Sequence, residues 1–250
     1  MNSFLNAWFH ALVQIGSRYF ILASIVFVIF YIVFKTPMMR RKIQQKFPIQ
    51  TDYYRDILNS VISMIIFAGV SVWTLMIIAP YTNVYNNIND YSKVYYAFTL
   101  IWMFFLHDAY FYWTHRAMHH PKLFRLVHLT HHKSNNPSPW TAYAFHPLEA
   151  IVEASIVPVI AFSIPTHRSA IVIYMLFQIV YNIYGHLGFE IMPKNMNRHW
   201  LGRWFNTSVS HNMHHQYSVK NYGLWTTIWD RAFGTMHARY DETYDKATQA

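Results

Sequence analysis

Histidine is the residue type on which the chemistry of this sequence depends, because seven of its 16 histidines fall between residues 107 and 132. His115 and His119 stand four positions apart, and side chains at that spacing share one face of a helix. Two segments, HLTHH and HNMHH, repeat one spacing and supply His128, His131, His132, His211, His214 and His215. On a helix, each triplet would gather its rings on one face. Imidazole is a common ligand of transition metals, so we predict a metal site.

The number of histidines indicates more than one metal ion. The pair and the two triplets together supply eight imidazoles, whereas one metal ion takes roughly four to six ligands. We therefore infer two metal ions. The chain contains no cysteine, which excludes disulfides, iron-sulfur clusters and thiolate zinc sites. The ligands must be nitrogen or oxygen atoms.

The composition is typical of a membrane protein. Hydrophobic residues make up 54% of the 250 residues and charged residues only 12%, a balance that water-soluble domains do not have. The formal net charge is +9, which favours an anionic membrane surface or an acidic protein as partner. So much apolar sequence argues against nucleic acid.

The apolar runs predict an all-α protein, an integral membrane helical bundle that forms a single membrane domain over residues 1–250. We expect membrane segments at residues 19–34, 57–78, 94–113, 150–164 and 170–184. The loop at residues 35–46 carries five basic residues and no acid, so the positive-inside rule places it in the cytoplasm. The last two segments are short, and they form either two short spans or one hairpin that dips into the bilayer. Either arrangement returns the chain to the cytoplasmic side.

Counting the spans places all of the histidine motifs on that same side. Residues 107–149 and 185–240 would then form a cytoplasmic helical cap that holds a histidine-rich dimetal site. The segment NYGLWTTIWDRAFGT near the end of the chain is expected to pack over that site.

The motifs HDAYFYWTHRAMHH, HLTHH, HPLEA and HNMHH, with the ending NYGLWTTIWDRAFGTMH, resemble the fatty acid hydroxylase superfamily. This superfamily includes sterol desaturases, sterol methyl oxidases, sphingolipid hydroxylases and alkylglycerol monooxygenase. The resemblance extends over residues 107–237. It implies a non-haem di-iron oxygenase that uses O2 and external electrons to hydroxylate or desaturate a lipid. Cytochrome b5, a ferredoxin or a reductase would supply the electrons, and HPLEA resembles the sterol-acting branches most.

The same resemblance implies which residues bind the two iron ions. The ligands would be His115, His119, His128, His131, His132, His186, His211, His214 and His215. Asn182, one helical turn before His186, falls where related sites use a histidine or an amide, and it is added as a candidate ligand. Sites made of imidazole also accept zinc.

Metal-bound histidines need partners that fix their ring orientation, and only 11 carboxylates are available. Asp108 precedes His115 by seven residues and lies on the same helical stripe, and Glu149 follows in HPLEA, so both are expected to orient ligand histidines. His107, His120 and His146 are expected beside the ligands. For His120 a ligand role stays open, and His146 precedes a proline and has capping of the next helix as its alternative.

Other classes of protein are weaker interpretations. A membrane metal transporter or metal-binding protein is the main alternative, but it would need polar residues along its spans, and Asp108 is almost the only acid within one. A membrane zinc hydrolase would be expected to carry HExxH, which is missing. Haem needs two axial imidazoles rather than triplets.

Overall fold

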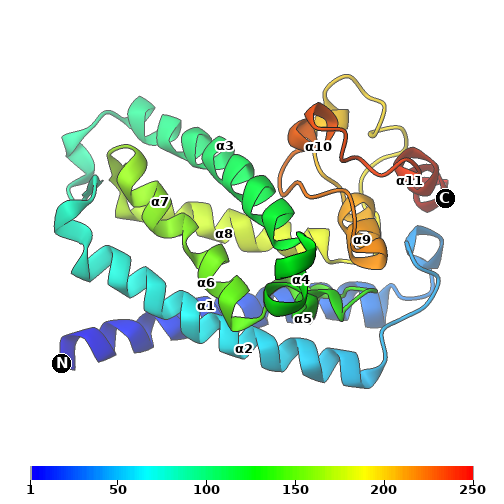
Figure 1. The fold of residues 1–250 in the computed structure, drawn as a ribbon, viewed down its shortest axis with the longest axis horizontal. Helices are drawn as coiled ribbons and strands as arrows, with labels where there is room; N and C mark the ends of the chain where they lie inside the picture. The colour runs from blue at the N-terminus through cyan, green and yellow to red at the C-terminus, as the bar shows by residue number, and fades with distance from the viewer. Residues whose placement is uncertain (1, 250) are drawn as a thin grey trace.

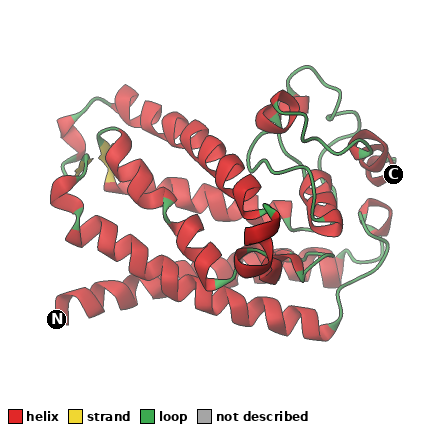
Figure 2. Ribbon diagram, viewed as in Figure 1, coloured by secondary structure: helices red, strands yellow, loops and turns green. Residues whose placement is uncertain are grey.

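The computed structural model describes residues 2–249, which fold almost entirely into helices, as Figures 1 and 2 show. The four longest helices are α1 (Asn2–Phe27), α2 (Gln50–Val72), α3 (Lys93–Met118) and α8 (Arg168–Gly185). The π-helical segments η1 (Val28–Val33) and η3 (Trp73–Ile77) prolong α1 and α2. Strands β1 (Val84–Tyr85) and β2 (Thr166–His167) pair in parallel and form the one sheet within residues 2–249. The expectation of an all-α fold is confirmed.

Shorter helices complete the chain between and after the long ones. They are η2 (Met39–Arg41), η4 (Ala79–Tyr81), η5 (Ile88–Asp90), α4 (Pro121–Val127), α5 (Leu129–His132), η6 (Pro139–Tyr143), α6 (Pro147–Ala154), α7 (Ile156–Ser163), η7 (Gly202–Trp204), α9 (Ser208–Tyr217), α10 (Ile228–Ala232) and α11 (Tyr240–Thr248). The segment predicted at 150–164 is divided between α6 and α7, with the break at Ser155.

Among residues 2–249, two helical stretches are long and apolar enough to cross a membrane, Ser3–Val33 with 31 residues and Gln50–Ile77 with 28 residues. The first begins well before the predicted start at residue 19. Polar residues in the N-terminal part lower its hydropathy, but that part packs on α2, where the Trp8 indole donates to the Ile65 carbonyl at 3.3 Å. Tertiary packing therefore extends the helix beyond the apolar run.

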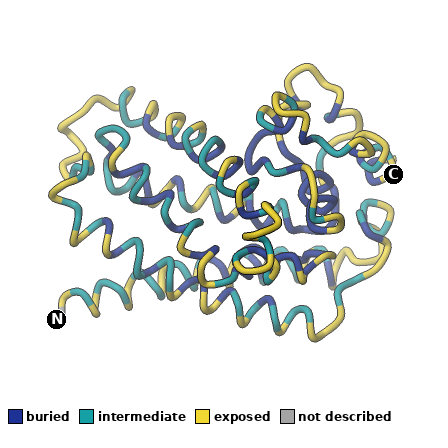
Figure 3. Tube along the Cα trace, in the orientation of Figure 1, coloured by how far each residue is buried: buried dark blue, intermediate teal, exposed yellow. Residues whose placement is uncertain are grey.

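Burial differs between the two halves of the molecule (Figure 3). Large apolar side chains point outward from the long helices, among them Ile21 (57% exposed) on α1, Ile32 (61%) on η1 and Phe177 (62%) on α8. Helices with apolar residues on their outer face are suited to a lipid environment. In contrast, α9 is buried at eight of its ten positions.

The connections at the two ends of the long helices are distinct. At one end, β1 and β2 join the α2–α3 connection to the turn before α8. At the other end, the basic loop before α2 contacts the segment after α8, where the Ile43 amide donates to the Gly188 carbonyl at 3.1 Å. Figure 1 shows α4, α5, α9 and α11 at this second end. The basic loop and the histidine-bearing segments therefore meet at the same end of the bundle.

Candidate metal centre

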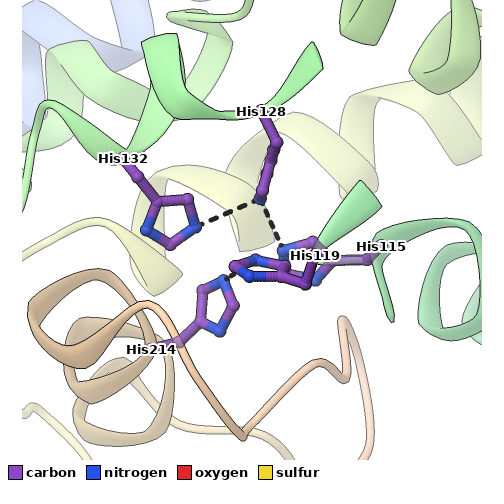
Figure 4. Close-up of side chains that lie close together, drawn as sticks. All are labelled: His115, His119, His128, His132 and His214. Carbon is purple, nitrogen blue, oxygen red and sulfur yellow. Dashed lines mark hydrogen bonds between the residues drawn. The ribbon is translucent and has the colours of Figure 1, made fainter. Parts of the chain in front are cut away.

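Nine histidines converge at that end of the bundle in two adjacent groups. The five-histidine cluster contains His115, His119, His128, His132 and His214, and the four-histidine cluster contains His131, His186, His211 and His215. Within each cluster, one nitrogen from every ring lies within 4.8 Å of the others. Figure 4 shows the five-histidine cluster, with its rings pointing toward one another from separate segments. The structure thus brings together all nine histidines that the family resemblance implied as ligands.

Each His-x-x-His-His triplet divides between the two clusters, which differs from the single helical face expected for it. Adjacent residues on a helix point about 100° apart, so His131 and His132 reach different clusters, as do His214 and His215. In the four-histidine cluster, His131 lies with His211 and His215 of the second triplet. In the five-histidine cluster, His214 lies with His128 and His132 of the first triplet. Both clusters therefore depend on the same pair of helical segments.

In several of these histidines, the Nδ1 atom is hydrogen-bonded to a backbone carbonyl, which fixes the orientation of the ring. The Nδ1 atoms of His131 and His186 lie 3.3 Å from the Ala144 carbonyl and 2.8 Å from the Asn182 carbonyl. A carbonyl oxygen can only accept, so each Nδ1 carries the hydrogen and donates it. In the neutral ring, Nε2 is then left with a free lone pair.

These lone pairs face one another inside the clusters. The Nε2 atoms of His131 and His186 are 3.3 Å apart, although neither has a hydrogen to share. His214 donates from Nδ1 to the Lys220 carbonyl at 2.7 Å, and its Nε2 lies 3.1 Å from Nε2 of His119. Converging lone pairs repel each other unless a cation lies between them. The donor set therefore fits a metal ion in each cluster.

Burial keeps the clusters uncharged. It lowers the pKa of His115 and of His186 to about 4 and that of His132 to about 3. Burial also lowers the pKa of His128, and the neighbouring histidines, His115 first among them, lower it further. At neutral pH the rings are unprotonated, which is the form that binds a metal ion.

Among residues 2–249, Glu149 supplies the one carboxylate that is hydrogen-bonded to a clustered histidine. Its Oε1 lies 2.6 Å from Nδ1 of His128, and both side chains are almost fully buried. Burial, with a smaller contribution from the nearby Glu153, raises the pKa of Glu149 well above its usual range. A cation held by the cluster would favour the ionised carboxylate. Glu149 is therefore placed to orient His128, as expected from HPLEA.

The loop after α9 contributes two more fixed acceptors. His115 donates from Nδ1 to the Tyr222 carbonyl at 2.9 Å, and the Lys220 carbonyl accepts from His214. The amides of Tyr222 and Gly223 in turn donate to Asp230 at 2.9 and 2.8 Å. We expected this segment to pack over the site, and it also holds two histidine rings in place. Backbone acceptors leave no signature in the sequence, but a buried aspartate in an aromatic segment was a usable signal.

That loop begins with residues in the left-handed region. Ser218, Lys220 and Asn221 have φ values of 55°, 65° and 54°, which costs energy for residues with a Cβ. The Asn221 side chain offsets this cost by donating to the Ser210 carbonyl at 3.0 Å and accepting from the His237 amide at 2.7 Å. The tight turn directs the Lys220 carbonyl back toward α9.

Asp108 requires a correction, since it does not orient a histidine directly. Its carboxylate accepts from the amides of Trp225 and Thr226 at 2.9 and 3.0 Å and from the Thr226 hydroxyl. Asp108 thus anchors the loop that carries the Tyr222 carbonyl. Its effect on His115 is indirect.

His107, His120 and His146, which were expected beside the ligands, form no hydrogen bond to a clustered histidine. His107 is buried and its Nδ1 lies 3.0 Å from the Tyr174 hydroxyl. His120 is exposed and accepts from the Lys122 amide, so it caps α4. His146 caps α6 in the same way, which was its alternative role. Asn182 was added as a candidate ligand, but its side-chain amide donates to the Ala142 carbonyl at 2.7 Å, and it is its backbone carbonyl that accepts from His186.

Comparison with known proteins agrees with this arrangement. The chain is 32% identical over 158 residues to the Delta(7)-sterol 5(6)-desaturase ERG3B of Gibberella zeae, covering 63% of this chain and 47% of that protein. It is 28% identical to the Delta(7)-sterol 5(6)-desaturase erg3C of Aspergillus fumigatus, covering 74% and 63%. It is 27% identical to lathosterol oxidase of Mus musculus, covering 64% and 53%.

The chain spans about half the length of the curated relatives it matches. No solved structure matches it. The family model described as fatty acid hydroxylase matches residues 100–235, more than half of the chain and all of the clustered histidines. The chain therefore belongs to the fatty acid hydroxylase family.

Proposed function

We propose that the protein is a membrane-bound non-haem oxygenase that hydroxylates or desaturates a lipid, using O2 and electrons from a separate donor. The observation that carries this proposal is the pair of histidine clusters whose Nε2 lone pairs converge. Membership of the family and the names of the relatives, which refer to sterols, support a lipid substrate.

The nine clustered histidines would hold two metal ions, which we propose to be iron. A bound pair of irons would supply the redox chemistry that an unactivated C–H bond requires. The protein's own residues fix the rings, because carbonyls and Glu149 hold the Nδ1 hydrogens. Neutral nitrogen ligands leave the positive charge of the metal ions uncompensated.

A small cavity lies where both clusters face each other. Its volume is about 10 Å³, and Phe111, Phe145, Glu149 and Glu153 line it together with histidines of both clusters. Roughly 10–15 Å³ is the minimum for one water molecule. Phe111 and Phe145 form the apolar part of its wall, and Glu149 and Glu153 are the carboxylates that line it.

We further propose that the clusters lie on the cytoplasmic side of the membrane, with O2 and the electron donor reaching them there. The positive-inside rule applied to the basic loop supports this side, since that loop contacts the segment after α8. The donor would be an acidic protein such as cytochrome b5, a ferredoxin or a reductase.

Helix α4 is the surface we assign to that donor. Its Phe124 ring packs against His119, with 5.2 Å between ring centroids. On the same helix, Lys122 and Arg125 are exposed. A basic surface that covers the five-histidine cluster favours an acidic partner close to the metal ions.

The proposal is tested by lipid analysis of a host that expresses the chain, compared with the same host without it. We expect a hydroxylated or desaturated lipid with the wild type, and its loss in His131→Ala and His214→Ala, one variant for each cluster. His120→Ala is the matched control, because His120 is exposed and caps α4. Product and bound metal that persist in both cluster variants would refute the proposal.

A further inference from the structure

Exposed apolar side chains gather where η7 lies beside α10, away from both histidine clusters. We call this set the cap patch, and it consists of Trp200, Leu201, Trp204, Phe205, Ile228 and Phe233. Trp200 is the most exposed of them, at 74%. Contiguous apolar surface of this kind marks a site that meets another protein or a membrane.

Backbone contacts hold the two halves of the cap patch together. The Thr227 amide donates to the Trp204 carbonyl at 2.9 Å, and the Thr227 hydroxyl donates to the Arg203 carbonyl at 2.7 Å. Phe205 and Thr226 form an isolated β-bridge. The side chains of the cap patch are therefore exposed on a fixed backbone and form one surface.

The cap patch continues onto the lipid-facing side of α3. Trp113 is exposed near the end of α3, and its ring lies 6.2 Å from the Trp229 ring and 4.9 Å from the Phe233 ring, measured between centroids. Ile101 and Phe105, earlier on α3, are also exposed. Figure 1 shows α10 near the C-terminal end of α3. Aromatic residues at the end of a membrane segment are typical of the membrane–water interface.

Two arginines lie at the cap patch without an acidic partner. The guanidinium carbons of Arg203 and Arg231 lie 4.9 and 5.9 Å from the centre of the Trp204 ring. Within residues 2–249, neither arginine forms an ion pair. Arg231 is oriented through Nε, which donates to the Arg203 carbonyl and the Thr227 hydroxyl. Its two terminal nitrogens make no hydrogen bond within that range, and such a fork matches a phosphate.

We propose that the cap patch lies in the headgroup layer of the membrane and that Arg203 and Arg231 bind an anionic phospholipid there. Aromatic and aliphatic side chains favour the boundary between headgroups and acyl chains, and basic side chains favour anionic lipids. An acidic protein would also satisfy the two arginines, but continuity with the lipid-facing side of α3 favours the membrane.

This contact would also reach the metal centre through α10. Asp230 of α10 accepts from the amides of Tyr222 and Gly223, and the Tyr222 carbonyl accepts from His115. The helix that meets the membrane therefore holds the loop that orients a clustered histidine. The inference depends on the membrane location of the long helices and not on the reaction proposed above.

The test is local lipid contact of the whole 250-residue chain, loaded with metal, in bilayers of equal parts phosphatidylcholine and phosphatidylserine. The chain contains no cysteine, so Leu201→Cys provides a single site for a bimane fluorophore and keeps every tryptophan. One lipid at a time carries bromine on its acyl chains, which quenches a fluorophore that it touches. We expect phosphatidylserine to quench at least about fivefold more effectively than phosphatidylcholine, the factor that one arginine contributes near an anionic surface. In Arg203→Gln/Arg231→Gln the two lipids should quench equally.

The matched control is Lys122→Gln/Arg125→Gln, which removes the same charge from exposed positions of α4 and should keep the preference for phosphatidylserine. The same fluorophore at Ala238→Cys, an exposed position before α11, should be quenched by neither lipid. Metal content checks that each variant is folded.

Three results would overturn the proposal. The first is a fluorophore at Leu201→Cys that neither lipid quenches, or that is quenched no more than the one at Ala238→Cys. The second is equal quenching by the two lipids without the arginine substitutions. The third is a preference for phosphatidylserine that persists in Arg203→Gln/Arg231→Gln. If the first result came with weaker binding of an acidic electron donor by that variant, the surface would belong to a protein.

Discussion

Replacement of Glu149 provides a quantitative test of how the five-histidine cluster is held. Its Oε1 accepts from Nδ1 of His128 at 2.6 Å, and the two side chains are 1% and 2% exposed. Glu149→Leu removes the acceptor and leaves a buried N–H without a partner. Glu149→Gln keeps an acceptor oxygen but removes the charge. The two variants therefore separate the hydrogen bond from its charge.

The expected size of the effect follows from the chemistry of this contact. Loss of a group that orients a metal-bound histidine lowers metal affinity by about 10- to 100-fold, which is roughly 1.4 to 2.8 kcal/mol. We expect this loss for Glu149→Leu. For Glu149→Gln we expect a loss of about 1 kcal/mol, the difference between charged and neutral hydrogen bonds.

The assay is removal of metal by increasing chelator, followed by measurement of metal per chain. In Glu149→Leu the metal of the five-histidine cluster should leave at 10- to 100-fold lower chelator concentration, and the metal of the four-histidine cluster should stay. Asp56→Asn is the control, since Asp56 is also buried but accepts from Ser134 and Thr141. Unchanged affinity in Glu149→Leu, or earlier loss from the four-histidine cluster, would refute this explanation.

Three further predictions concern stability and the electron donor. Burial lowers the pKa of Lys42 from 10.5 to about 8, so between these pH values the unfolded chain binds more protons than the folded chain. The free energy of unfolding should therefore rise by roughly 3 kcal/mol from pH 8 to 10.5, and Lys42→Met should abolish this rise in denaturant titrations at each pH. Gly188 has φ +75°, and a Cβ there would lie 2.8 Å from the Tyr31 hydroxyl. Gly188→Ala should therefore lower the free energy of unfolding by more than about 1 kcal/mol, which thermal unfolding would show as a lower midpoint. Gly16→Ala, whose Cβ meets only Met64 at 3.8 Å, should leave the midpoint unchanged. The double variant Lys122→Glu/Arg125→Glu should raise KM for an acidic electron donor several-fold with unchanged metal content, and an unchanged KM at low salt would count against α4 as the docking surface.

The sequence was sufficient to predict a helical protein and, with the family resemblance for His186, to identify the nine histidines that cluster. The spacing of His115 and His119 and the repeated triplets are properties of single helices, so they can be read locally. The division of each triplet between the clusters could not be predicted, because it depends on how α5 and α9 lie relative to each other. A single triplet shows no preference for one cluster.

The supporting contacts were harder to predict for a different reason. Several acceptors, such as the Tyr222 and Lys220 carbonyls, belong to the backbone and have no residue type that reveals them. Asp108 was singled out because it lies on the helical stripe of His115, but it meets a loop more than 100 residues later. Helical periodicity identifies the face on which a side chain lies and does not identify which distant segment covers that face.

The central claim is that histidines from distant segments form two adjacent metal sites in one chain. The most direct test is the number of metal ions bound per purified chain after iron loading, in the wild type and in the variant His128→Ala/His214→Ala. We predict two ions in the wild type and one in the variant, because both replaced residues belong to the five-histidine cluster. A single ion in the wild type, or two ions retained by the variant, would contradict the claim.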